Sequence, residues 1–146
     1  MMRMETAEVE RALRAAAPQA FEGTAVLFAF LFGSTATGRA RQGSDVDVAV
    51  YLDPATAPEQ YLPLTLDLAG RLADASGLPR IEVVVMNDAP LQLLGSILRE
   101  RVVISSRDEV ARVRFEGGTR SMFFDFDIHA RRLDRELLAR TRDGRR

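Results

Sequence analysis

The sequence predicts a mixed α/β fold, and three observations lead to this fold class. Segments in which apolar residues recur at helical spacing alternate along the chain with short, continuous apolar runs rich in valine. No internal repeat or linker separates them. The length of 146 residues, 47% hydrophobic and 28% charged, is that of one globular domain. We expect a single domain over residues 1–146, with a core of about residues 6–105 and a C-terminal helical arm of about residues 108–140.

The first part of the chain predicts a helix followed by a buried strand. Residues 6–17 are rich in alanine and arginine with helical spacing, and we expect this helix to stop before Pro18. Residues 24–32 form a continuous apolar run that ends at Gly33. Such a run is typical of a strand that is buried on both faces.

The next two segments predict a second strand and a second helix. Residues 45–52 begin with strict alternation of aspartate and valine, which is the period of a strand. Residues 59–75 have helical spacing, and Gly77 follows them as a helix stop. Five apolar residues are expected on one side of this helix: Leu62, Leu66, Leu68, Ala69 and Leu72.

The second half of the chain predicts two more strands and two more helices. The valine-rich residues 81–86 and the short apolar run 102–105 are expected to be strands, with a helix over residues 90–99 between them. Residues 108–140 are helical again, with an interruption at Gly117-Gly118 because glycine is a poor helix former.

The composition excludes several classes of function. With 20 basic and 21 acidic residues the formal net charge is −1, which argues against direct binding of nucleic acid. The chain has no cysteine, one histidine (His129) and no lysine, since all its basic residues are arginine. Disulfides, thiolate zinc sites and lysine nucleophiles are therefore excluded. The chemistry is left to carboxylates, hydroxyls, arginines and a bound metal.

The apolar segments are too short for a membrane span. The longest of them, residues 25–32, has eight residues, against the roughly 18–20 that a bilayer requires. The first eight residues lack the pattern of a signal peptide. We therefore expect a cytoplasmic protein that does not bind membranes.

One stretch, residues 31–50, carries the residues most suited to chemistry. Gly33 allows the backbone to approach a phosphate without a side chain in the way. Ser34 is expected to offer a hydroxyl and an amide at the start of a short helix, where unpaired N–H groups favour an anion. Asp45 and Asp47 are two residues apart on the predicted strand, so both carboxylates point to the same face.

Two adjacent carboxylates repel each other unless a cation neutralises them, and oxygen ligands suit Mg²⁺ or Mn²⁺. The alternative is structural: Asp45 as a cap of a turn and Asp47 as a solvated strand residue. The metal-binding interpretation is favoured because an aspartate pair that interrupts a β-branched run has no structural motive. The valines between and after the aspartates are expected to point into the core and fix the register of the strand.

The spacing of this stretch resembles a known signature. The stretch resembles the motif of the nucleotidyltransferase superfamily that includes DNA polymerase β, because ten residues separate Gly33-Ser34 from Asp45-x-Asp47. The short chain and the order of its elements resemble the minimal nucleotidyltransferase (MNT) group, in particular the antitoxins of HEPN–MNT toxin–antitoxin pairs. The resemblance implies a mixed sheet of three to four strands, helices on one face and a C-terminal helical arm.

The resemblance also implies roles for individual residues. Asp45 and Asp47 would hold Mg²⁺ (or Mn²⁺), together with a third carboxylate on the next strand, Glu82, where aspartate is commoner in the family. Thr35 and Thr37 stand where the family often has arginine, so Arg41 or Arg39 would neutralise phosphate charge instead. The residues expected to bind the nucleotide are Gly33, Ser34, Arg41 and Ser44.

The function that the resemblance implies is the transfer of AMP from ATP to a tyrosine hydroxyl of a HEPN ribonuclease toxin encoded nearby, within a hetero-oligomer. A second hypothesis is a binding-only antitoxin that sequesters its partner through the C-terminal arm. A third is a small-molecule nucleotidyltransferase of the aminoglycoside type. The arm itself allows two interpretations, because its apolar residues suit either packing on the sheet or contact with a partner. They include four phenylalanines: Phe115, Phe123, Phe124 and Phe126.

Overall fold

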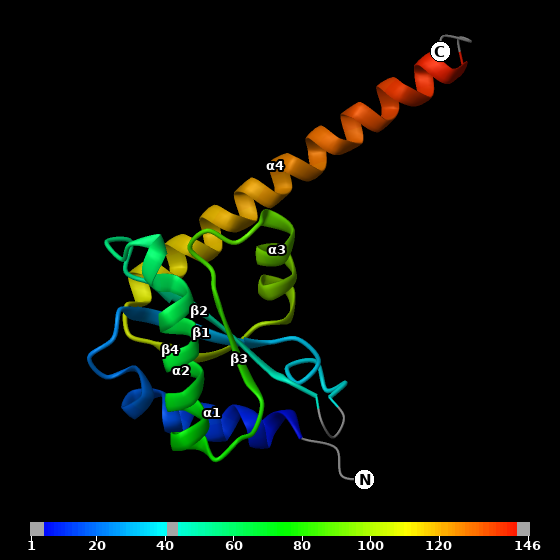
Figure 1. The fold of residues 1–146 in the computed structure, drawn as a ribbon. Coiled ribbons are helices and arrows are strands. Elements are labelled where there is room, and N and C mark those ends of the chain that lie inside the picture. The colour runs from blue at the N-terminus through cyan, green and yellow to red at the C-terminus, as the bar shows by residue number, and fades with distance from the viewer. Residues whose placement is uncertain (1–4, 41–43, 143–146) are drawn as a thin grey trace.

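The computed structural model describes residues 5–40 and 44–142 of the chain. Within these residues, four strands form one mixed sheet in the order β3-β2-β1-β4, which confirms the predicted fold class (Figure 1). The central pair β1 and β2 is antiparallel, β4 is antiparallel to β1, and β3 is parallel to β2. The strands are β1 (Val26–Phe32), β2 (Val46–Leu52), β3 (Ile81–Val85) and β4 (Val102–Ser106).

The helices cover both faces of the sheet, so the expectation of helices on one face is wrong. Helices α1 and α2 pack on one face, where a first cluster of apolar side chains lies, and α3 and the start of α4 pack on the other. The physical reason is in β1, whose phenylalanines Phe28, Phe30 and Phe32 alternate with residues of the first cluster and need a cover of their own. The helices are α1 (Thr6–Phe21), α2 (Tyr61–Ser76), α3 (Leu91–Glu100) and α4 (Glu109–Arg142), with a short 3₁₀ turn at Pro58–Gln60.

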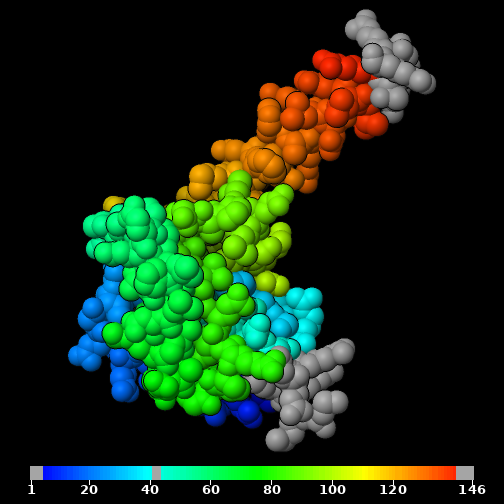
Figure 2. Space-filling view, in the orientation of Figure 1, coloured from blue at the N-terminus to red at the C-terminus, as the bar shows by residue number. Residues whose placement is uncertain are grey.

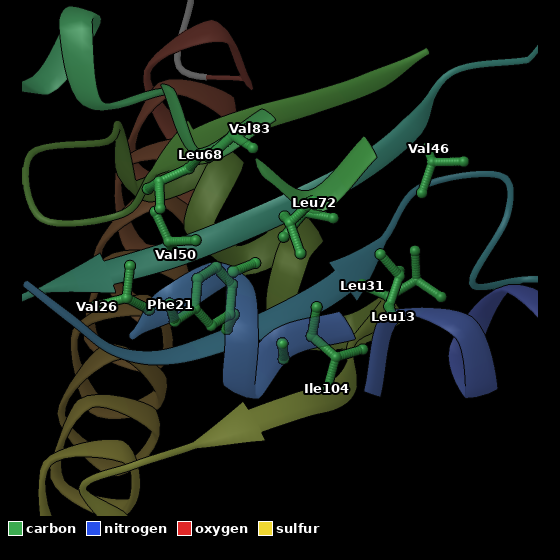
Figure 3. Close-up of a cluster of buried hydrophobic side chains, with 14 of the residues drawn as sticks. Leu13, Phe21, Val26, Leu31, Val46, Val50, Leu68, Leu72, Val83 and Ile104 are labelled. Atoms are coloured by element: carbon green, nitrogen blue, oxygen red, sulfur yellow. The ribbon is translucent and has the colours of Figure 1, made fainter. Parts of the chain in front are cut away.

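The first cluster joins α1 and α2 to the sheet (Figure 3). Phe21 of α1 and the pair Leu68 and Leu72 of α2 are completely buried in this cluster, together with Val46 and Val50 of β2, which were expected to point into the core. Burial of each such side chain contributes about 1.5–3 kcal/mol.

Two of the five apolar residues that were expected on one side of α2 lie away from the side that the helix buries. Leu62 and Leu66 are 70% and 69% exposed. They lie roughly 120–160° around the helix from Leu68, so the helix buries the side that carries Leu68 and Leu72 and leaves these two leucines in solvent.

Two helices continue through residues that were expected to end or interrupt them. Helix α1 includes Pro18 and ends at Phe21, whose ring is buried. Helix α4 runs for 34 residues through Gly117-Gly118 without a break. Each glycine costs about 1 kcal/mol in a helix interior, which tertiary contacts of the first turns of α4 offset.

The contacts of α4 with the domain centre on a buried carboxylate, Glu116. One oxygen of this carboxylate accepts a hydrogen bond from Arg112 at 2.7 Å, and the other accepts from Arg101, which lies between α3 and β4. Nearby, Phe115 packs against Phe28 and Tyr51 with ring centroids 5.6 and 5.1 Å away. These contacts hold the base of the helix against the second face of the sheet.

We expect the replacement of Glu116 by alanine to cost about 1–3 kcal/mol of folding free energy, because Arg101 loses its buried carboxylate partner while Arg112 keeps its ion pair with Glu109. Urea unfolding measures this cost. The matched control is Asp67→Ala, which removes an exposed ion pair with Arg71 and should cost less than about 1 kcal/mol. Equal effects of the two substitutions would contradict the role given to Glu116.

Beyond its base, α4 leaves the domain as a projecting arm (Figures 1 and 2). We call residues 121–142 the arm. Phe115, at the base of the helix, packs on the sheet as the packing interpretation expects, whereas most of the large apolar side chains of the arm are exposed. Those at least 43% exposed are Met122, Phe124, Phe126, Ile128, Leu133, Leu137 and Leu138. No helix of the described residues has the length and apolar character of a membrane span.

Candidate functional site

The candidate site lies where β1 ends and β2 begins. Gly33 follows β1 with a positive φ of 79°, and a turn rather than the expected short helix follows it. Two backbone hydrogen bonds close this turn, from Thr37 N–H to Gly33 O at 3.2 Å and from Arg39 N–H to Ser34 O at 2.8 Å. The segment is too short to form a regular helix, so the phosphate-binding element predicted at Ser34 is a turn.

Thr35 anchors this turn to the domain from inside. Its side chain is completely buried, and its hydroxyl donates to the carbonyl of Asp45 at 3.5 Å. Its own carbonyl accepts from the Thr6 hydroxyl at 2.5 Å. Thr35 therefore ties the turn both to α1 and to the start of β2.

Asp47 lies directly beside Gly33. A Cβ atom added to Gly33 would stand 2.4 Å from Oδ2 of Asp47, which is closer than any real contact. The pairing of β1 and β2 explains the proximity, since Asp47 is opposite Phe32, the residue before Gly33. Glycine is therefore required here both by its φ angle and by its neighbour.

The sheet also brings Glu82 next to Asp47. The two residues are direct partners in the parallel pairing of β2 and β3, so their side chains stand on the same face. Asp45 immediately precedes β2 and is exposed. The structure thus places the three predicted acidic residues at one end of two neighbouring strands.

The electrostatics of this cluster are unfavourable without a cation. Burial raises the pKa of Asp47 above its ordinary value, and the negative charges of Glu82, Asp45 and Glu100 raise it further, in that order. Repulsion of this kind is relieved by a bound cation or by protonation. Asp47 is therefore the residue whose charge most needs compensation.

The donors present suit a hard divalent cation, because carboxylate oxygens are the ligands that Mg²⁺ and Mn²⁺ prefer. Among the described residues, no three acidic or histidine side chains lie close enough together to hold a metal ion as they stand. Mg²⁺ needs only one or two protein carboxylates, because it usually keeps water and substrate phosphate as its other ligands. The residues present therefore fit the ion, with its coordination completed from outside the chain.

A residue that the sequence did not single out, Glu100, completes the site. Its Oε1 accepts a hydrogen bond from the Gly33 N–H at 3.3 Å, and its Oε2 accepts from Arg39 at 3.2 Å. The Arg39 Nε in turn donates to the Thr37 hydroxyl at 2.9 Å. Glu100 is at the end of α3, 67 residues from Gly33 in sequence. In the sequence, the one feature that could have pointed to Glu100 is its position between Arg99 and Arg101, directly before the strand β4 that pairs with β1.

The remaining predicted residues are placed as follows. Ser34 is half-buried in the turn, and Ser44 is half-buried directly before Asp45. Arg41 lies outside the described residues. Arg39, the alternative to Arg41, has an exposed side chain that is held by Glu100 and Thr37.

Comparison with known families gives one match. The family described as Polymerase beta, Nucleotidyltransferase matches residues 18–110, which include the turn, both aspartates, Glu82 and Glu100. A search of curated proteins gives no match.

Several solved structures share the fold. A chain of a toxin–antitoxin complex with AMP-PNP is 17% identical, with a TM-score of 0.63 over 86% of this chain and 98% of that one. A chain of the MntA–HepT toxin–antitoxin complex is 15% identical, with a TM-score of 0.60 over 88% and 98%. The same values apply to a chain from a complex of the tri-AMPylated Shewanella oneidensis HEPN toxin with its MNT antitoxin. At these identities the likeness establishes the fold.

Proposed function

The chain belongs to the polymerase beta nucleotidyltransferase family, and from this premise we propose that it is an antitoxin that transfers AMP from ATP to a tyrosine hydroxyl of a HEPN-type ribonuclease toxin. The observation that carries the proposal is the cluster of Asp45, Asp47 and Glu82 beside the Gly33 turn. The similar structures that contain AMP-PNP or an AMPylated HEPN toxin support the choice of AMP and of the partner.

The turn is the part of the site that would bind the nucleotide phosphates. The N–H of Gly33 and the guanidinium of Arg39 already hold an anionic group, the Glu100 carboxylate, in this structure. Ser34, in the turn, and Ser44, directly before Asp45, would add hydroxyl donors. Arg41, between them in the sequence, would add a further cation. Hydrogen bonds from charged donors fix a triphosphate more firmly than neutral ones do.

The carboxylates would hold a divalent cation and handle the proton. Asp45, Asp47 and Glu82 would be its ligands, and bound there the ion would compensate the charge of the triphosphate. In the transfer, the acceptor hydroxyl oxygen forms a bond to the α-phosphorus of ATP while the bond to diphosphate breaks. Glu82, which is exposed, would accept the hydroxyl proton.

Intact-mass spectrometry tests this proposal directly. The chain is incubated with ATP, Mg²⁺ and the HEPN toxin encoded next to it. We expect the toxin to gain the mass of one or more AMP groups, and we expect no gain when EDTA replaces Mg²⁺ or when ATP is omitted. An unmodified toxin in a stable complex would instead support a binding-only antitoxin, the second candidate function.

The projecting arm supports a partner-binding role in either case. Phe126, Ala130, Leu133 and Leu137 follow one another at intervals of four, three and four residues, so they form one stripe along the helix. Phe126, Leu133 and Leu137 are 53%, 46% and 60% exposed. We infer that this stripe is the surface that contacts the toxin.

We expect the double substitution Leu133→Arg with Leu137→Arg to abolish co-purification of the toxin, because it places two charges in the apolar stripe. The melting temperature should not change, since both residues are exposed. The matched control is Leu62→Arg with Leu66→Arg, a pair at the same spacing that is exposed on α2. If the arm variant retains the toxin as well as the control does, the arm is not the contact surface.

A further inference from the structure

Glu100 uses the two hydrogen-bond donors that a nucleotide phosphate would need. Its carboxylate takes the single N–H of Gly33 with one oxygen and the guanidinium of Arg39 with the other. The side chain is 25% exposed and comes from the C-terminal end of α3, directly before β4. In the sheet, β4 and β3 are the two outer strands, so Glu100 and Glu82 approach the turn from opposite sides. In charge and in spacing of its oxygens, Glu100 stands in for a phosphate.

A phosphate and the Glu100 carboxylate cannot share this position. One N–H has one hydrogen to donate, and two anions at hydrogen-bond distance from the same group repel each other strongly. On the side where a side chain at position 33 would project, the space is already filled by the Asp47 carboxylate. A phosphate that binds to Gly33 must therefore displace Glu100 toward solvent.

We propose that Glu100 is an internal competitor of the nucleotide: it occupies the position of a nucleotide phosphate and lowers the affinity for ATP until the triphosphate displaces it. This inference rests on the proposed nucleotide-binding function. It predicts that removal of the Glu100 carboxylate increases the affinity of the site for ATP. If Glu100 were a metal ligand its removal would weaken the binding of ATP, and if its role were purely structural its removal would leave the affinity unchanged.

Isothermal titration calorimetry with ATP and Mg²⁺ tests the competition. We expect Glu100→Ala to bind ATP about tenfold more tightly than the wild type, which corresponds to about 1.4 kcal/mol. Glu100→Gln should bind about threefold more tightly, because it loses the charge and keeps an acceptor for the Gly33 N–H. The control is Glu10→Ala, a carboxylate that is also 25% exposed and paired with an arginine, on α1, and its affinity should equal that of the wild type.

A double-mutant cycle with Arg39→Ala separates direct competition from a general effect of charge. In the wild type, ATP gains a contact with Arg39 only by breaking the pair that Arg39 makes with Glu100. In the Glu100→Ala variant, ATP contacts Arg39 without having to break this pair. Arg39→Ala should therefore weaken ATP binding more in the Glu100→Ala background than in the wild type. Equal effects in the two backgrounds would overturn the shared use of Arg39.

The outcomes distinguish this inference from the proposed function. Unchanged or weaker ATP binding by both Glu100 variants, with normal binding by the wild type, overturns the competition and leaves the nucleotidyltransferase proposal standing. Binding by Glu100→Ala where the wild type shows none supports both. Failure of the wild type and of folded Glu100 variants to bind ATP overturns both, and melting temperatures establish that the variants are folded.

Discussion

Replacement of Asp47 by asparagine is expected to reduce AMP transfer by at least about 10³-fold and, at the same time, to stabilise the metal-free protein. The first effect follows from the loss of a charge at the centre of the carboxylate cluster. The second follows because the ionised Asp47 is repelled by Glu82, Asp45 and Glu100. Since the cluster is partly solvated, the gain should remain below about 1 kcal/mol, or about 2–4 °C in melting temperature.

The pH dependence of this gain has a definite sign. Folding raises the pKa of Asp47, so the folded chain binds a proton more readily than the unfolded chain does. Ionised Asp47 therefore lowers the free energy of unfolding at neutral pH, and this cost decreases as pH falls through the raised pKa toward the ordinary value of about 3.9. The stability advantage of Asp47→Asn should be largest near neutral pH and disappear in acid.

Differential scanning fluorimetry with and without Mg²⁺ completes the test. Mg²⁺ should raise the melting temperature of the wild type, because a ligand that binds only the folded state stabilises it, and it should have little effect on Asp47→Asn. The control is Asp67→Asn, an exposed carboxylate on α2 that should match the wild type in activity. A variant at Asp47 that transfers AMP at the wild-type rate would contradict the assignment of the site.

Replacement of Gly33 by alanine is expected to reduce AMP transfer by about 10²-fold. The added Cβ would stand 2.4 Å from Oδ2 and 3.3 Å from Cγ of Asp47, so either the turn or the carboxylate must move. A displacement of about 1 Å in such a site costs about 10²-fold in rate. The φ of 79° adds a stability cost of about 1–2 kcal/mol for any residue with a side chain.

Gly77→Ala separates these two effects. Gly77 ends α2 with a φ of 75°, close to that of Gly33, but nothing lies within 4 Å of an added Cβ. We expect a similar loss of stability in urea unfolding and no loss of AMP transfer. Equal activities of the two alanine variants would show that the contact between Gly33 and Asp47 is unimportant.

The parts of the fold that were predictable are those fixed by local patterns. The strand over Val46–Leu52 follows from the alternation of aspartate and valine, and the structure buries Val46 and Val50 as that pattern requires. Gly33, Ser34 and the two aspartates were identified because they lie within fifteen residues of one another, although the turn after Gly33 was expected to be a short helix. Their spacing alone does not place Glu82, which depends on the parallel pairing of β2 with β3 and was identified through the family resemblance.

The errors arose where tertiary contacts outweigh local preference. Gly117-Gly118 favours a break in an isolated helix, yet the ion pairs of Glu116 and the packing of Phe115 hold the first turns of α4 in place. Glu100 was missed because its contact with Gly33 crosses 67 residues and leaves no periodic signal. The helices on the second face of the sheet could not be predicted, because the sequence does not show which elements cover Phe28 and Phe30.

The length of the arm determines how far from the domain a bound partner would be held. At about 1.5 Å per residue, residues 121–142 extend about 33 Å, which is comparable to the diameter of a small domain. A toxin held at Leu133 and Leu137 would be anchored far from the carboxylates at the sheet end, so its acceptor hydroxyl has to arrive on a separate segment of the toxin. Tethering would raise the local concentration of that segment, and the same attachment could serve successive acceptors without being released between transfers.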